Sequence, residues 1–204
     1  MFGDPLSEKK YPIASLEMIC TKITDGEHGS VKRISTGHPF LNAKHIKKDG
    51  TIDWNTVSYI SDYDHKRIYK RCNPETGDIL LTTTGTIGNI AIVPPDNKEF
   101  SMDRGITLLK LDNSKVKSEF VAILLKQPSI QEEMKINVHA SAIGHLFMNQ
   151  VKRLTAVVPP MDLQSEFVLF VHRIDKSRLE MVKSSNMIQN VIQYNVNTNF
   201  SDKE

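Results

Sequence analysis

Short apolar runs separated by turn residues dominate the chain up to about residue 112. The runs are rich in Ile, Val, Leu and Thr, and each is bounded by Gly, Pro, Asn or Asp, which is the pattern of short β-strands. The Asp49-Gly50 step favours a tight turn among them, because both residues tolerate positive φ. The strand-like runs cover residues 43–46, 57–60, 78–83, 89–93 and 106–111. We therefore expect this region to be mostly β-sheet.

The spacing of apolar residues becomes helical after residue 112. Helices are predicted over residues 118–125, where a serine can act as the N-cap, and from Pro128 to about Ile136. A last strand over residues 155–158 ends at a double proline. These elements predict a mixed α+β domain over residues 1–160.

The C-terminal region carries the longest periodic pattern. No Gly or Pro occurs from Asp162, a suitable N-cap, to Asn195, which permits a helix of about 50 Å. Apolar residues recur there at alternating steps of four and three, the heptad spacing of a coiled-coil seam, and two serines, Ser177 and Ser184, mark thin places in it. The apolar members of the seam are Leu163, Phe167, Phe170, Ile174, Met181, Ile188 and Val191, and the first six are the predicted dimer contacts.

A helix of this length is too long for a small β domain to cover. We therefore predict a coiled-coil-type helix over residues 161–196 that pairs antiparallel with a second copy of the chain, followed by a flexible tail over residues 197–204. The alternative is a C-terminal helix that folds back on its own domain.

Composition limits the class of protein. The chain has 204 residues, of which 39% are hydrophobic and 25% charged, close to the average of soluble globular domains. Its two cysteines, Cys20 and Cys72, form no C-x-x-C pair, so we expect free thiols. No signal-like segment opens the sequence and no apolar run could span a bilayer. These features predict a cytoplasmic protein with no membrane association.

The charge is unevenly distributed. The net charge is only +2, yet residues 32–71 contain nine Lys or Arg against four acids. Three histidines, Trp54 and three tyrosines lie among these cations. Cations interleaved with aromatic residues suit a phosphate-rich partner. The alternative is an ordinary solvated face whose aromatic residues point inward.

Motifs of cofactor-dependent enzymes and hydrolases are absent from the sequence. One nuclease-like combination is present, because Asp96 could join Glu133 and Lys135 in an Asp…Glu-x-Lys arrangement that binds a cation. Glu133 and Lys135 lie two apart on a predicted helix and would point in different directions, which disfavours this interpretation. His28 has no Cys or second His at ligand spacing, so we expect no metal site.

Two polar turns could approach a nucleic acid. The turn at residues 25–29 has two glycines and a histidine, and it could meet a phosphate or a base or be an ordinary surface loop. The threonine-rich turn at residues 82–88 places Gly85 and Gly88 three apart, which formally matches the Gly-x-x-Gly loop of KH-type RNA-binding proteins. A KH loop joins two helices, whereas this one joins two strand-like runs, so a tight hairpin is equally compatible with the pattern.

Several phrases, taken in order, resemble the DNA-specificity (S) subunits of type I restriction–modification systems. The resemblance covers nearly the whole chain. The family's Asp-Gly-x-His turn is matched by Asp25-Gly26-Glu27-His28, and its opening motif resembles Met1-Phe2-Gly3-Asp4-Pro5. Its strand–turn–strand core resembles Gly77-Asp78-Ile79-Leu80 with Gly85-Thr86-Ile87-Gly88. The lead into its spacer helix resembles Ser141-Ala142-Ile143-Gly144-His145-Leu146 followed by Val158-Pro159-Pro160 and Leu163-Gln164.

The resemblance implies a β-rich target-recognition domain followed by a long spacer helix. A full subunit of the family has two such domains and two helices, so this chain corresponds to half a subunit: a natural half-length form that dimerises, a truncated product or a fragment. The implied role is sequence choice rather than catalysis. S-adenosylmethionine, ATP and magnesium are then expected in the modification and restriction/motor subunits, with no cofactor bound by this chain.

On this basis we predict one surface that faces double-stranded DNA. The basic excess supplies phosphate contacts, and the threonine turn supplies hydroxyls for base edges. The predicted DNA-binding residues are Lys32, Arg33, Lys44, His45, Lys47, Lys48, Lys66, Arg67, Arg71, Thr83, Thr84 and Thr86. The target bases, the half-site spacing and the modification partner cannot be deduced from these residues. A metal-dependent nuclease and an RNA-binding module that uses Gly85–Gly88 stand as alternatives.

Overall fold

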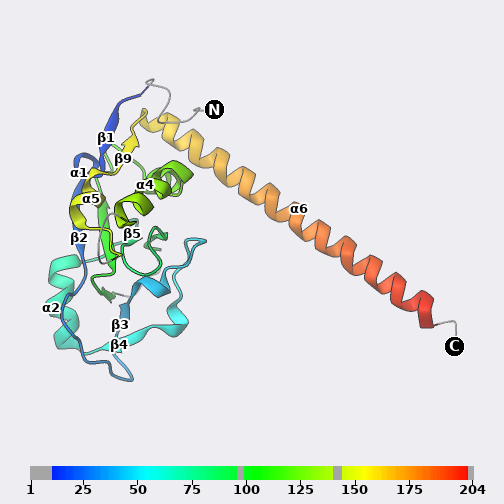
Figure 1. Cartoon of the computed structure of the whole chain (residues 1–204), viewed down its shortest axis with the longest axis horizontal. Helices are drawn as coiled ribbons and strands as arrows, with labels where there is room; N and C mark the ends of the chain where they lie inside the picture. Colours follow the sequence, from blue (N-terminus) through cyan, green and yellow to red (C-terminus); the bar gives the residue numbers. More distant parts are fainter. Residues whose placement is uncertain (1–10, 96–98, 140–143, 202–204) are drawn as a thin grey trace. The chain divides into compact units, whose positions relative to one another are not determined.

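The computed structural model describes residues 11–95, 99–139 and 144–201. Its contacts divide the chain into two compact units, Met1–Gln164 and Ser165–Glu204. The mixed α+β class with a long C-terminal helix is as predicted (Figure 1). Within the described residues, none of the helices is long and apolar enough to cross a membrane.

A four-stranded antiparallel sheet forms the centre of the first unit. The strand order is β2-β8-β5-β6. Every residue of β5 is buried, and only Lys110 of β8 is not, because helices and loops cover both faces. The strands are β2 (Cys20–Asp25), β5 (Ile79–Thr82), β6 (Ile90–Ile92) and β8 (Ile106–Leu111). The last three confirm predicted strands.

A second sheet has the order β4-β3-β7. β3 (His38–Leu41) pairs antiparallel with β4 (Ser58–Ile60) and parallel with β7 (Ser101–Met102). The strand-like run at 43–46 is instead the 3₁₀ helix η1 (Ala43–His45), and a second one is η2 (Trp54–Thr56). The prediction of a strand was wrong there because the backbone N–H of Asn42 donates to His45 Nδ1, 2.9 Å away, and closes the turn.

The helix α2 (Asp62–Cys72) packs against β7 and β2 and was not predicted. Its sequence is polar overall, but its buried residues His65, Ile68 and Cys72 lie on one face, and Ser61 is an N-cap whose Oγ accepts a hydrogen bond from the Asp64 N–H at 3.1 Å. The helix ends at Asn73, which has a left-handed backbone (φ 34°).

The two ends of the first unit meet in a third sheet. β1 (Ile13–Ser15) pairs antiparallel with β9 (Thr155–Val157), which confirms the last predicted strand. Besides α2, four α-helices lie between β1 and β9 in the sequence: α1 (Leu16–Ile19), α3 (Ser118–Leu125), α4 (Pro128–His139) and α5 (Met148–Arg153). Of these, α3 and α4 confirm the helices predicted at 118–125 and 128–136.

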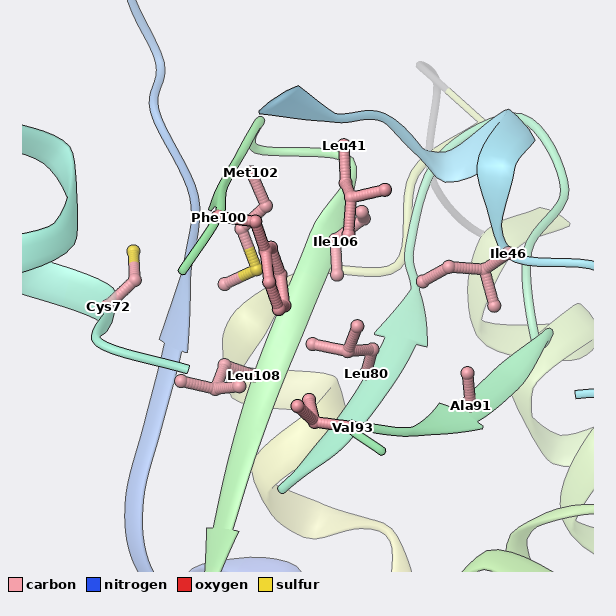
Figure 2. Close-up of a cluster of buried hydrophobic side chains, with 10 residues drawn as sticks. All are labelled: Leu41, Ile46, Cys72, Leu80, Ala91, Val93, Phe100, Met102, Ile106 and Leu108. Carbon is pink, nitrogen blue, oxygen red and sulfur yellow. The ribbon is translucent and has the colours of Figure 1, made fainter. Parts of the chain in front are cut away.

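One apolar core joins the two larger sheets, as Figure 2 shows. Trp54 packs edge-on to Phe100 with ring centroids 5.5 Å apart at the border of this core. Both cysteines are free, as predicted, and burial raises the pKa of Cys72 to about 11. The core residues are Leu41, Ile46, Cys72, Leu80, Ala91, Val93, Phe100, Met102, Ile106 and Leu108. The core therefore fixes the loops at the ends of β3, β5, β7 and β8.

The C-terminal helix α6 runs from Met161 to Ser201. It therefore extends past the predicted end at residue 196 into the predicted tail, because no Gly or Pro interrupts it. Gln164, the last residue of the first unit, is fully buried. Its side-chain amide donates to the carbonyls of Lys115 and Pro159, each at 2.9 Å, and accepts from the Lys117 N–H at 2.9 Å. The beginning of α6 is thus hydrogen-bonded to the rest of the first unit.

Candidate nucleic-acid interface

Three loops enclose an open hollow of 420 Å³ at one edge of the first unit. They are η1 with its N-cap, the turn between β5 and β6, and the turn between β7 and β8. The lining is mixed, with two cations, one acid and several small residues that leave backbone accessible. The lining residues are Asn42, Ala43, Lys44, Thr84, Gly85, Asp103, Arg104 and Gly105. We call this site the loop hollow.

The three loops are in direct contact at Gly105. A Cβ built there would lie at ordinary contact distance from the other two loops, 3.5 Å from Ala43 Cβ and 3.6 Å from Thr84 Cβ, and closer, at 3.0 Å, to Asp103 Oδ1 of its own turn. Asp103 joins two of them, because one carboxylate oxygen accepts from Asn42 Nδ2 at 2.8 Å and the other from the Gly105 N–H at 2.9 Å. The loop hollow is therefore held by hydrogen bonds between loops.

The threonine turn is a hairpin between β5 and β6, as one of the two interpretations of its sequence proposed. Its context is therefore not that of a KH loop, which joins helices. Thr84 Oγ1 lies 2.8 Å from His145 Nδ1, and Thr86 Oγ1 donates to the Ala43 carbonyl at 3.1 Å. Gly85 at the tip has φ +69° and no atom within 4 Å of a built Cβ, so its backbone is open to a ligand.

The Asp25–His28 turn packs against the β7–β8 turn and is hydrogen-bonded to it. A Cβ on Gly26 would overlap the carbonyl oxygens of Met102 and Asp103, so only glycine permits this approach. The Glu27 N–H donates to the Met102 carbonyl at 2.8 Å, and the Arg104 N–H donates to the Glu27 carbonyl at 3.0 Å. His28 Nε2 lies 2.6 Å from Asp25 Oδ2. The turn predicted as a possible ligand contact thus has a supporting role.

Three predicted DNA-binding cations on α2 are engaged in ion pairs. Arg71 pairs with Asp25, Arg67 pairs with Glu27 at 2.8 Å, and Lys66 pairs with Asp62 at 2.7 Å. Partial burial raises the pKa of Glu27, but hydrogen bonds from the Gly29 N–H and from Arg67 outweigh it and hold the pKa below its usual value. The arginines therefore join α2 to the 25–28 turn.

The other predicted cations differ in whether a neighbouring acid or ring is in contact with their charge. Lys47 pairs with Asp53 at 3.1 Å, and the Arg33 guanidinium lies 4.0 Å from the centroid of the Phe40 ring. Lys32, Lys44 and Lys48 are exposed and form no ion pair with the described residues. Of these three lysines, Lys44 lines the loop hollow.

Two predicted DNA-binding residues are corrected by their burial. The side chains of His45 and Thr83 are each 1% exposed, so they do not form part of the accessible surface. Burial, followed by the charge of Lys44, lowers the pKa of His45, which supports η1 through its bond to Asn42. Thr83 instead uses its backbone, whose N–H donates to the Gly105 carbonyl at 2.8 Å and whose carbonyl accepts from the Leu146 N–H at 3.0 Å.

Three residues that complete the loop hollow or its rim were not predicted from the sequence: Arg104, Asn42 and His145. The available signal was the Asp103-Arg104-Gly105 turn directly before a predicted strand, a position where a polar loop is expected. It was not used because β7 has only two residues and was not recognised.

The nuclease-like combination gains no support from the described residues. Asp96, like the opening phrase at 1–5 and residues 141–143, lies outside them. Glu133 and Lys135 both lie on α4, and Lys135 pairs with Glu132 at 3.3 Å. Within residues 11–95, 99–139 and 144–201, no group of three His, Cys, Asp or Glu is arranged to hold a metal ion.

Comparisons with solved structures show that the fold is shared. The chain is similar to the HsdS subunit from Thermoanaerobacter tengcongensis (17% identity, TM-score 0.60, 89% of this chain and 46% of that one). It is also similar to the type I restriction–modification S subunit from M. genitalium (18%, 0.54, 92% and 46%). A third match comes from work on complex assembly and conformational transition of the type I R-M system (14%, 0.59, 83% and 39%). The chain thus spans less than half the length of these proteins.

Sequence comparison identifies the family directly. No curated protein sequence matches the chain significantly. The family model described as the type I restriction modification DNA specificity domain matches residues 27–190, which include the loop hollow and most of α6. The chain therefore belongs to the family of type I restriction modification DNA specificity domains, as its sequence motifs had indicated.

Proposed function

We propose that this chain is a DNA-binding specificity subunit that chooses the site at which partner subunits methylate and cleave DNA. The observation that carries the proposal is the loop hollow, where Lys44 and Arg104 are exposed without an acidic partner among the described residues. It occurs on a domain whose family is defined by DNA specificity. The chain's own role is recognition, and the chemistry belongs to modification and restriction/motor subunits that bind S-adenosylmethionine, ATP and magnesium.

Different residues of this proposed surface are suited to phosphates and to bases. Lys32, Lys44 and Lys48 are flexible, exposed point charges, suited to phosphates. Thr84 and Thr86 present hydroxyls at the rim of the loop hollow, suited to base edges. Arg33 and Lys47, which are exposed but already in contact with a ring or an acid, have secondary places on this surface.

Salt dependence of binding tests the phosphate contacts. The chain is used to select duplexes from a random double-stranded library, and its affinity for the selected site is measured over a range of salt concentrations. Replacing both Lys44 and Lys48 with Ala should weaken binding and reduce the salt slope by roughly 0.9 for each phosphate that the variant no longer neutralises. The matched control replaces Lys70 and Lys183, two exposed lysines outside the loop hollow that, like Lys44 and Lys48, form no ion pair with the described residues. An unchanged slope in the Lys44 and Lys48 variant would count against this surface, and cleavage of the duplex with magnesium alone would favour a nuclease.

We further propose a homodimer formed by antiparallel pairing of α6. The described seam residues Phe170, Ile174, Met181 and Ile188 are 43%, 48%, 66% and 60% exposed. Leu163 and Phe167, nearer the start of α6, are partly buried and continue the same heptad series. Ser177 and Ser184 leave open hollows between the larger seam residues, which knobs from a partner helix could fill. A two-fold dimer carries two identical recognition units, so we expect a bipartite palindromic site.

Oligomeric state tests the dimer. The wild-type chain should be dimeric by light scattering at tens of micromolar, and Phe170→Ala with Ile174→Ala should make it monomeric, because truncating a buried large residue costs about 2–5 kcal/mol. Leu179→Ala with Val182→Ala removes two exposed apolar residues away from the seam and should leave the dimer intact. A monomeric wild-type chain, or an asymmetric site read by this chain alone, would contradict the proposal.

A further inference from the structure

We propose that Arg104 reads a guanine in the major groove and is the main base-specificity residue of the loop hollow. This inference rests on the proposed function, because it assigns a base contact within the proposed DNA surface. Its evidence is the fixed backbone of Arg104, its free charge and the chemistry of its side chain.

The backbone that carries Arg104 is held from two sides. The Arg104 N–H donates to the Glu27 carbonyl at 3.0 Å, and the adjacent Asp103 N–H donates to the Leu41 carbonyl at 3.0 Å. Gly26 allows the 25–28 turn to approach the Met102 and Asp103 carbonyls closely. A side chain on a turn held in this way is presented at a defined place, as direct base readout requires.

The charge of Arg104 is not neutralised by its neighbours. The adjacent Asp103 carboxylate is occupied by Asn42 Nδ2 and the Gly105 N–H, and the described residues include no ion pair to Arg104. Arg67 and Arg71, in contrast, are paired with the acids of the 25–28 turn. Among the described residues, Arg104 is the one arginine that lines the loop hollow.

The chemistry of the two cations in the loop hollow separates their roles. The planar guanidinium of Arg104 can donate two parallel hydrogen bonds to guanine O6 and N7, which is the commonest specific contact in the major groove. The ammonium group of Lys44 is a point charge suited to a phosphate. The charge of Arg104 also reaches the opposite rim, because burial first and Arg104 second lower the pKa of His145, the partner of Thr84. His145 and the Thr84 hydroxyl complete the polar rim around the base.

The experiment compares variants on the site selected by the full-length chain from a random duplex library. Each guanine of the selected half-site is replaced in turn by 7-deazaguanine, which lacks the N7 acceptor. The wild-type chain should lose affinity at one guanine, by less than the roughly 5- to 150-fold of a whole bidentate contact, because the O6 hydrogen bond remains. Arg104→Ala should bind the unmodified site more weakly by that whole factor and should show no further loss on 7-deazaguanine. Arg104→Lys should keep the salt slope without restoring the choice of guanine.

Arg153→Ala is the matched control, because Arg153 is an exposed arginine outside the loop hollow. It should retain the wild-type preference. A selected site without guanine, or an Arg104→Ala variant that loses affinity equally for every sequence, would overturn the assignment while leaving DNA recognition intact. A wild-type chain that enriches no sequence and binds duplex without preference would overturn the proposed function itself and this assignment with it.

Discussion

The helix α2 and the loop hollow both carry cations, but they differ in how many of these charges are paired. On α2, the side chains of Lys66, Arg67 and Arg71 pair with Asp62, Glu27 and Asp25, whereas Lys70 is exposed without an ion pair among the described residues. In the loop hollow, Lys44 and Arg104 have no such partners among the described residues, and Asp103 is bonded to amide groups instead.

The difference shows that a local excess of cations does not tell which of them are free to bind a polyanion. Glu27 and Asp25, which pair with Arg67 and Arg71, lie 40 and 46 positions away in the sequence, whereas Asp64, a second partner of Arg67 at 3.7 Å, lies three positions away. Conversely, Arg104 lies outside the basic stretch at 32–71 and joins it only through the fold. A cation becomes available to phosphates or bases when the acids near it in space are used elsewhere.

The largest effect that tests this comparison is expected at Gly26. An alanine Cβ would overlap two carbonyl oxygens of the β7–β8 turn, so the free energy of unfolding should fall by about 3 kcal/mol, at the upper end of the cost of overpacking. The displaced turn carries Arg104, so sequence preference should weaken with stability. Urea unfolding followed by binding at a temperature where the variant is folded measures both effects. Preserved stability would show that the 25–28 turn does not support the hollow.

Gly85→Ala is the matched comparison. Its built Cβ meets no atom within 4 Å, but its φ of +69° strains a non-glycine residue, so a loss of about 1 kcal/mol is expected. A loss as large as that at Gly26 would mean that backbone strain, rather than close packing of turns, dominates both sites.

A smaller effect is expected from removing both Arg67 and Arg71. Exposed ion pairs contribute roughly 0.2–1 kcal/mol each, so the double alanine variant should be modestly less stable by urea unfolding. Its salt slope for DNA binding should match that of the wild-type chain, because these charges are already paired. Arg67→Lys with Arg71→Lys keeps the charges and controls for their number. A reduced salt slope with unchanged stability would place α2 on the DNA surface instead.

The smallest effect expected is a dependence of stability on pH near neutrality. Burial first, and the charge of the stacked His38 second, lower the pKa of His65, whose ring lies 3.8 Å from that of His38. Glu99 and Asp62 oppose this shift without reversing it. The unfolded chain therefore takes up a proton before the folded one, so stability should fall as the pH drops below about 6.5.

Urea unfolding at several pH values between about 7.5 and 5.5 measures this dependence. Replacing His65 with Gln removes the titrating ring and should make the dependence shallower, while the neutral forms of His45 and His145 continue to contribute. Stability that rises as the pH falls over this range would contradict the assignment.

The regular parts of the fold could be predicted from periodicity, and the irregular parts could not. The strands at 79–82, 90–92 and 106–111 and the helices α3, α4 and α6 carry clear apolar spacing. The helix α2 is amphipathic, but His65 and Cys72 make up most of its buried face, so spacing of aliphatic residues alone does not reveal it. β7 has two residues, and its pairing with β3 depends on contacts far apart in the sequence.

The candidate site was predictable only in part for the same reason. Lys44 and Thr84 could be found from composition and turn chemistry, but whether a side chain is buried or paired depends on distant residues. His45 and Thr83 look like polar surface residues in sequence, yet the packing of three loops encloses them. The position of Arg104 at the loop hollow depends on the close approach of the 25–28 turn at Gly26 and on contacts among three loops, none of which is visible in the sequence.

The pairing of β1 with β9 has a consequence for how the recognition unit can change. The Leu16 N–H bonds to the Leu154 carbonyl and the Val158 N–H to the Pro12 carbonyl, each at 2.8 Å, so the chain enters and leaves this unit at the same place. The residues between these two strands form one continuous insert, whose ends are held together by the β1–β9 pair; we call this pair the clasp. A different insert could occupy the clasp if it kept the backbone groups of Lys115 and Lys117 that bond Gln164 at the start of α6. The architecture therefore allows the segment between the two strands to be exchanged as one unit rather than residue by residue.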